Sequence, residues 1–273
     1  MATSRLARDA LGLGLRIPHY RDLFATEPAV DFFEIITENF LGEAAPPRRN
    51  LARVRARYPV VLHGVGLNLL GAEPLDEVYL DRVKALADLV DAPFVTDHLC
   101  WTGSEGVSHH DLLPAPLVPE LIPFAAERAR YVQSRLGRPF GLENVSSYLE
   151  FTRSTLPEWE FLSAVAEQAD CGILLDVNNV FVSAKNHGFS PEAYLRAIDP
   201  ARVLQVHLAG HQDGPEGLLV DTHDRPVRDE VWALYRRAWE LLGPFPTLLE
   251  WDADVPPLPV ALAELERARE ARR

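Results

Sequence analysis

Short apolar segments that end in polar side chains recur along this chain, and they constrain its fold more than any other feature. The segment GILLDVNN, residues 172–179, is typical, because an apolar run suited to a buried parallel strand ends in a carboxylate and two amides. Eight short apolar or β-branched runs are present, and most of them end in a polar side chain: Leu11–Ile17, Val30–Ile36, Pro59–His63, Pro93–Asp97, Pro139–Glu143, Gly172–Asp176, Val203–His207 and Pro246–Glu250. A buried carboxylate is costly unless solvent, hydrogen bonds or a cation meets it.

Segments with helical periodicity separate most of these predicted strands. They include Leu75–Leu89, Leu117–Leu136, Pro157–Gln168, Pro191–Ile198 and Val227–Leu242. Alternating strands and helices in 273 residues favour a (β/α)8, or TIM, barrel over a doubly wound sheet, because such barrels typically need about 250 residues. No Gly/Ser linker divides the chain, so we predict a single α/β domain over residues 1–273.

The lengths of the connections orient the predicted barrel. Turns that enter strands are short, whereas long stretches leave them, at Trp101–Pro116, Asn144–Pro157, Asn178–Ser190 and Ala209–Arg228. Barrel enzymes build their sites from the loops that follow the strands, at the C-terminal face. We therefore expect the chemistry of this chain at that face.

Six of the eight predicted strands end in side chains that can bind metal ions. These are His63, His98, Glu143, Asp176, His207 and Glu250, and the loop after His207 adds Asp221 and His223. All nine histidines lie at or just after predicted strand ends and none lies in a predicted helix. One such histidine could simply cap a loop, but barrel closure brings the strand ends into one pocket, where imidazole and carboxylate suit iron, manganese or zinc.

The number of candidates favours more than one metal ion. A mononuclear site uses three or four protein ligands, and Glu143, on a middle strand, could bridge two ions through its two oxygens. Among the nearby amides, Asn179, three residues after Asp176, is the best candidate for a further ligand. Arg16 and Arg225 could hold a substrate carboxylate.

Charge and cysteine content exclude several classes of protein. A net charge of -13 and a pI near 5.1 disfavour binding to nucleic acid. The chain has neither a signal-peptide pattern nor a long apolar stretch, so we expect a cytoplasmic protein without a membrane partner. Cys100 and Cys171 lack the spacing of a thiolate zinc site or a disulfide framework. Any metal must therefore use nitrogen and oxygen ligands.

Taken together, these motifs resemble those of the multinuclear non-haem iron-dependent oxidative enzyme family. The matching stretches run from about Leu11 to Asp252 and include DFFEIITENF, VVLHGVGLNL, TDHLCW, LENVSSYLEF, LLDVNNVFVSAKNHGF, HLAGH, DTHDRPV and LLEWD. The resemblance implies a xylose isomerase-like barrel that holds two or three iron ions. It also implies dioxygen-dependent modification of residues, above all cysteine, in a ribosomally made precursor peptide that a small partner protein presents.

The resemblance further implies roles for individual residues. It places one ion at His63, His98 and Glu143, a second at Glu143, Asp176, His207 and Glu250, and a third near Asp221, His223 and either Asn179 or His187. Glu143, Asp176 and His207 are the expected catalytic residues, Asn144 and Tyr148 would orient ligands, and zinc or manganese could replace iron in purified protein. One departure is the pair Leu117-Val118, where the family favours an aromatic residue and threonine, so substrate contacts there differ.

Two other classes of function fit the same residues. A metal-dependent hydrolase or isomerase could use the same kind of barrel, but an endonuclease would need a basic face and a sugar isomerase often uses a catalytic lysine. The only lysines here are Lys84, in a predicted helix, and Lys185. A metal-stabilised scaffold without activity is the third hypothesis, and it predicts no turnover by the fully metallated protein.

Overall fold

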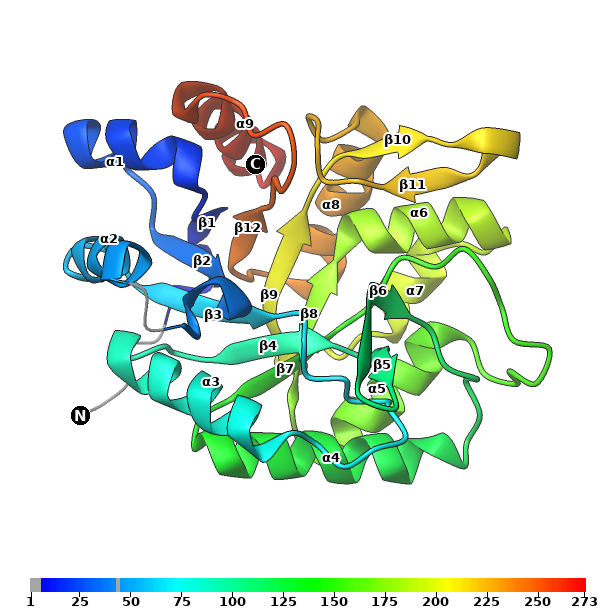
Figure 1. Cartoon of the computed structure of the whole chain (residues 1–273). Coiled ribbons are helices and arrows are strands. Elements are labelled where there is room, and N and C mark those ends of the chain that lie inside the picture. The colour runs from blue at the N-terminus through cyan, green and yellow to red at the C-terminus, as the bar shows by residue number, and fades with distance from the viewer. Residues whose placement is uncertain (1–5, 43–44) are drawn as a thin grey trace.

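A closed barrel of eight parallel strands forms the centre of the protein, and it confirms the predicted (β/α)8 fold. The computed structural model describes residues 6–42 and 45–273. Around the barrel the strands follow the order β1-β12-β9-β8-β7-β4-β3-β2 (Figure 1). Their bounds are β1 Leu11–Gly14, β2 Phe32–Ile36, β3 Val60–Gly64, β4 Val95–His98, β7 Phe140–Glu143, β8 Gly172–Asp176, β9 Val203–Leu208 and β12 Thr247–Leu249.

Helices pack around the outside of this barrel (Figure 1). They are α1 Tyr20–Thr26, α2 Ala45–Arg55, α3 Glu77–Val90, α4 Leu121–Leu136, α5 Glu158–Ala169, α6 Val177–His187, α7 Pro191–Ala197, α8 Asp229–Leu242 and α9 Leu258–Ala271. Short 3-10 turns lie at Ile17–His19, Thr37–Phe40, Pro200–Arg202 and Pro215–Gly217. Apolar side chains on the inner faces of the helices bury the outer faces of the strands, which is the packing that a barrel requires.

The barrel interior is apolar at one end and polar at the other. Phe32, Val61 and Leu248 belong to a small buried cluster, and the ring of Phe32 lies so close to Gly12 that a side chain there would collide with it. Because successive side chains of a strand point to opposite faces, the residue two positions later faces the interior again. Glu34 and His63 occupy those later positions, so the polar groups sit above the apolar layer, toward the C-terminal ends of the strands.

One predicted loop is wrong. Residues 178–190 were expected to form a long loop, but Val177–His187 forms α6, which follows β8 without a turn. The Asp176 carboxylate caps the helix by accepting a hydrogen bond from the Asn179 N–H, and Gly188, with φ 75°, ends it. The asparagine pair favours a turn and the valines have low helix propensity, and burial on nearly every side removes the periodicity that identifies a helix.

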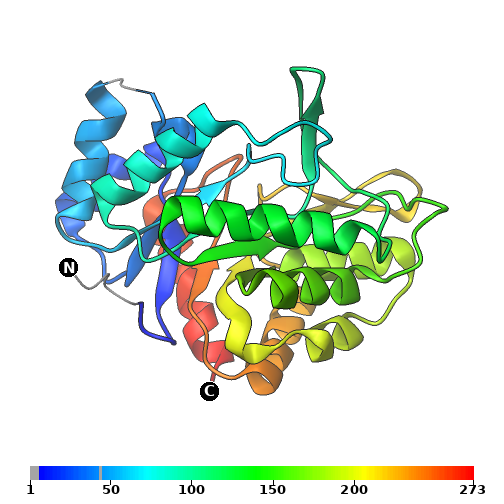
Figure 2. The same cartoon turned by 90° about the horizontal axis from the view of Figure 1, so that it is seen from below.

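Two of the other predicted loops at the same face, Trp101–Pro116 and Ala209–Arg228, each contain a β-hairpin. One joins β5 Trp101–Ser104 to β6 Val107–Leu113, and the other joins β10 His211–Asp213 to β11 Leu219–Asp221. Figure 2 shows the first hairpin projecting away from the body of the barrel. Within residues 6–42 and 45–273, no helix combines the length and apolar character needed to cross a membrane.

Candidate metal centre

The metal-competent side chains predicted from the strand ends meet inside the mouth of the barrel. Strand pairing sets His98 on β4 level with Glu143 on β7, and Asp176 on β8 level with His207 on β9. Glu250 follows β12 directly. All of these side chains are buried, together with His63. Closely spaced buried acids and imidazoles need either mutual hydrogen bonds or cations to compensate their lost hydration.

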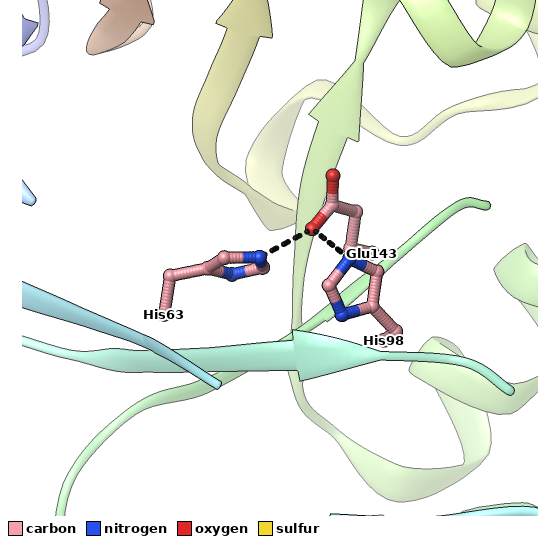
Figure 3. A group of neighbouring side chains, drawn as sticks. All are labelled: His63, His98 and Glu143. Carbon is pink, nitrogen blue, oxygen red and sulfur yellow. Dashed lines mark ion pairs between the residues drawn. The ribbon is translucent and has the colours of Figure 1, made fainter. Parts of the chain in front are cut away.

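The first group joins two imidazoles to one carboxylate (Figure 3). The Nε2 atoms of His63 and His98 lie 3.1 Å and 3.2 Å from the same oxygen, Oε2 of Glu143. The Nδ1 atom of His63 lies 2.9 Å from Thr96 Oγ1, and that of His98 lies 3.1 Å from the Gly64 carbonyl oxygen. The carbonyl requires a proton on His98 Nδ1. The Thr96 hydroxyl donates to the Leu62 carbonyl oxygen at 3.4 Å and therefore accepts from His63 Nδ1, so both Nε2 atoms carry lone pairs.

The protonation of this group favours a cation at its centre. Burial lowers the pKa of His98 to about 4, and burial together with neighbouring histidines lowers that of His63 well below its usual range. Burial also raises the pKa of Glu143 well above its usual range. A proton on Glu143 could satisfy only one of the two imidazoles, whereas a divalent cation would satisfy all three groups, so the residues fit a bound metal ion.

The second group shares Glu143 with the first. Nδ1 of His207 lies 3.6 Å from the other carboxylate oxygen of Glu143, Oε1, and 3.1 Å from Oε2 of Glu250. Glu143, Asp176 and His207 each offer a ligand atom within 4.8 Å of the others. The two oxygens of Glu143 therefore face two different sets of ligands, which is the geometry of a bridging carboxylate.

A buried acid on a neighbouring strand orients His207. Nε2 of His207 lies 3.1 Å from Glu34, and Gln205 donates to the same carboxylate. Although burial acts to lower it, the contacts with Glu34 and Glu250 raise the pKa of His207 well above its usual range. With Nε2 held by Glu34, Nδ1 is the nitrogen that can bind metal once it gives up its proton, and a carboxylate behind a ligating histidine is a frequent arrangement in metal sites.

A third group lies at the edge of the pocket. Asp176, His223 and Glu250 again place one ligand atom each within 4.8 Å of the others. Nε2 of His223 lies 2.7 Å from Oδ1 of Asp221, which also accepts a hydrogen bond from Asn178. Asp221 can thus serve either as a ligand or as the partner that orients His223.

The amide and the remaining histidine proposed for the third ion lie in different surroundings. The side-chain oxygen of Asn179 is buried and has no hydrogen-bond partner, and its NH2 group donates to the Asn144 carbonyl oxygen. His187 instead ends α6, and its Nε2 lies 3.0 Å from the Ser147 carbonyl oxygen. Among the described residues, it belongs to no group whose ligand atoms lie close enough together to share a metal ion. The expectation that no histidine lies in a helix is wrong for His187.

The residues expected to orient the imidazoles contact the backbone of two acidic residues instead. Asn144 exchanges two hydrogen bonds with the backbone of Asp176, at 2.9 Å and 3.0 Å. The hydroxyl of Tyr148 accepts a hydrogen bond from the Asp221 N–H at 3.0 Å. Both therefore position acidic residues of the centre.

Several contacts of the centre could not be identified from the sequence. Arg16 binds Asp252 and lies 3.5 Å from Glu250, while Arg225 pairs with Asp224, so both arginines already hold carboxylates of this chain. Glu34 is not one of the strand-end candidates, although a charge inside the run FFEII is a signal of an inward-facing polar residue.

Two bacterial proteins named as UPF0276 proteins are similar to this chain. A UPF0276 protein of Rhizorhabdus wittichii is 49% identical over 98% of this chain and 96% of its own length. Another, of Caulobacter vibrioides, is 49% identical over 96% of this chain and 93% of its own length. Both matches span nearly the whole of each protein, so the similarity is not confined to the metal-competent residues.

Solved structures support the fold. A xylose isomerase domain protein from Alicyclobacillus acidocaldarius superposes with a TM-score of 0.63 at 23% identity, covering 96% of this chain and 98% of that one. A xylose isomerase-like TIM barrel protein from Mycobacterium smegmatis, solved in complex with magnesium, gives 0.62 at 14% identity, covering 99% and 100%. Identities this low establish the architecture alone.

A family model matches almost the entire sequence. Residues 10–273 match the family described as RiPP precursor modification enzyme MbnB/TglH/ChrH, in which RiPP denotes a ribosomally synthesised and post-translationally modified peptide. The family resemblance seen in the motifs is thereby confirmed. With its strand-end residues gathered in the mouth of a xylose isomerase-like barrel, the chain belongs to the MbnB/TglH/ChrH family of precursor-peptide modification enzymes.

Proposed function

We propose that this protein is a multinuclear non-haem iron-dependent oxidase or oxygenase that modifies cysteine in a ribosomally made precursor peptide. The observation that carries the proposal is the position of Glu143, whose two oxygens face two ligand groups that use only nitrogen and oxygen atoms. Such ligand sets suit redox-active iron. Membership of a family that modifies precursor peptides supports the substrate class.

The protein residues would hold the ions and set their surroundings. His63, His98 and Glu143 would hold one ion, and Glu143, Asp176, His207 and Glu250 a second. Asp221 and His223, with Asn179, would hold a third, whereas His187 is a weaker candidate because it contacts the Ser147 backbone. Bound iron would supply the electron-transfer chemistry with dioxygen, and the peptide would be oxidised as dioxygen is reduced.

Other residues of the chain would keep this centre in shape. Thr96 and the Gly64 carbonyl group hold the two imidazoles of the first group in one tautomer. Glu34 holds the Nε2 atom of His207, so the Nδ1 atom of the same ring is directed at the ligand group. Fixed ligands of this kind reduce the reorganisation needed during a reaction. The catalytic residues in this proposal are Glu143, Asp176 and His207.

A small partner protein that presents the peptide is part of the proposal, and so is a cytoplasmic location, where precursor peptides are made. The acidic charge of -13 favours peptides over nucleic acid as the substrate.

Parallel assays of the iron and zinc forms would test the proposed chemistry. We expect the iron form, given a cysteine-containing precursor peptide encoded beside this gene and its partner protein, to consume oxygen and change the peptide mass. Zinc has no accessible redox chemistry, so the zinc form should do neither. Turnover by the zinc form without oxygen would instead identify a hydrolase or isomerase, since these need only a Lewis acid.

A further inference from the structure

A second feature of the C-terminal face is an apolar cavity of about 200 Å³ outside the ligand groups. Its walls include Leu99, Leu117, Val145, Leu149, Phe161 and Phe189. They come from the segments after β4, β6, β7 and α6 and from α5. Protein interiors contain few voids larger than a water molecule, so a cavity of this size calls for an occupant.

The cavity borders the candidate metal centre on one side. The N–H of Leu99 donates to the carbonyl oxygen of Glu143 at 2.9 Å, and Val145 lies two residues beyond Glu143. The wall of the cavity is thus continuous with the end of β7, which carries the bridging carboxylate.

The loop that forms the rim also reaches the other edge of the centre. Ser147 and Leu149 line the cavity, while Tyr148 between them accepts a hydrogen bond from the Asp221 N–H. Asp221 in turn lies 2.7 Å from His223. A peptide bound in an extended conformation across this loop would therefore contact the centre and the cavity together.

Hydrogen bonds to α6 hold this rim in place. The Ser147 N–H donates to Ser183 Oγ at 3.0 Å, and the Ser147 carbonyl oxygen accepts from Asn186 and His187 at 3.1 Å and 3.0 Å. These contacts give His187 a role in positioning the rim. Leu149, beyond this fixed peptide group, is 51% exposed and leaves an apolar side chain at the entrance.

Size and chemistry define what the cavity can bind. An apolar cavity of about 150 Å³ is sufficient for benzene, so the volume of about 200 Å³ accommodates one side chain of leucine, methionine or phenylalanine size. An acidic side chain would lose its hydration against these largely apolar walls and would lie near Glu150 and Glu158, which also line the cavity.

We infer that this cavity is a specificity pocket that takes one large apolar side chain of the substrate peptide, near the residue that is modified. The inference rests on the proposed function for the identity of the ligand, since a peptide held at the metal centre would pass over the Tyr148 loop. The apolar side chain would anchor the peptide, and the reacting residue would lie at the metal centre.

Binding of a small probe would test the pocket without metal or oxygen. We expect N-acetyl-L-phenylalaninamide to bind the metal-free protein saturably in ligand-observed NMR. The α-amide of N-acetyl-L-aspartic acid, which keeps its side-chain carboxylate, should bind at least about tenfold more weakly. Leu149→Asp, at the exposed rim, and Ala115→Leu, which fills the wall, should each weaken binding of the phenylalanine probe by about tenfold. Leu89→Asp on α3 is the matched control, because Leu89 is 59% exposed and outside the cavity, and it should bind normally.

The outcomes separate this inference from the proposed function. Equal probe affinity in the wild type and Leu149→Asp, or no saturable binding to the wild type, would overturn the pocket. Normal probe binding with no oxidation of the peptide would retain the pocket and reject the iron chemistry. Oxidation of the peptide with the same kcat/KM in Leu149→Asp as in the wild type would reject the pocket and retain the chemistry.

Discussion

Glu143 lies between three imidazole groups of the centre. One oxygen faces two imidazole nitrogens and the other faces His207, so no single proton on this carboxyl group can satisfy all three neighbours. His63 and His98 belong to one ligand group each, whereas Asp176 and His207 also take part in a second one. Loss of Glu143 should therefore affect more than one ion.

We predict that Glu143→Ala removes the bridged ions together rather than slowing turnover alone. After anaerobic reconstitution with iron, elemental analysis should find about two or more ions per chain in the wild type and far fewer in the variant. Glu264→Ala is a suitable control, because Glu264 is also buried and accepts a hydrogen bond from Val227, away from the centre. Wild-type iron content in Glu143→Ala would show that Glu143 does not bridge.

At the scale of elements, the junction between β8 and α6 combines two functions in one side chain. Oδ1 of Asp176 accepts a hydrogen bond from the Asn179 N–H at 2.6 Å, and Oδ2 is buried without a partner in the protein. Because α6 begins directly after the strand, the cap and the candidate ligand must be the same residue. Burial raises the pKa of Asp176 to about 6, so the charge that this carboxylate carries at neutral pH costs more in the metal-free protein than it would in water.

We predict that two substitutions at Asp176 separate capping from metal binding. Asp176→Asn keeps an N-cap and removes a buried charge, so the metal-free variant should be at least as stable as the wild type while losing iron. Asp176→Ala should lose iron and also about 1 kcal/mol of stability in urea unfolding of the metal-free protein.

The N-cap of α3 offers a matched comparison. Asp76 accepts hydrogen bonds from the N–H groups of Val78 and Tyr79 and is not among the metal-competent residues. Asp76→Ala should therefore reduce stability to a similar degree with normal iron content. Full iron binding by Asp176→Asn would contradict a ligand role for the Asp176 carboxylate.

At the scale of the molecule, the candidate ligands come from strands spread around the whole barrel. β3, β4, β7, β8 and β9 each contribute one, and Glu250 follows β12. Ions bound at these positions would link strands that are distant in sequence. The unfolded chain does not bring these ligands together, so the ions would bind the folded protein much more tightly than the unfolded one. Metal binding should therefore act directly on global stability.

We predict that removing metal lowers the melting temperature by several degrees. Free metal at about 100 times its Kd stabilises a folded protein by about 2.7 kcal/mol, and each kcal/mol corresponds to about 2–4 °C in a chain of this order of size. Calorimetry with and without a chelator measures the difference. The Glu264→Ala variant should retain it and Glu143→Ala should lose most of it, whereas an identical response in these two variants would place the stabilising metal elsewhere.

The sequence by itself determined the barrel and the composition of its centre. Eight apolar runs alternating with helices indicate the architecture, and polar residues at the ends of these runs must meet when parallel strands close. His63, His98, Glu143 and Asp176 were identifiable in this way because the direction of a side chain at a strand end follows from the strand alone.

Only the tertiary structure decided which of these residues face one another and what holds them. Glu34 meets His207 across 173 positions of sequence, through strand register that local propensity does not encode. α6 forms because packing on all sides, together with the cap from Asp176, outweighs the loop preference of its asparagines. That helix carries His187 to the rim of the apolar cavity. Local sequence determines which groups are present, whereas the distances between strands brought together by folding determine which of them can share an ion.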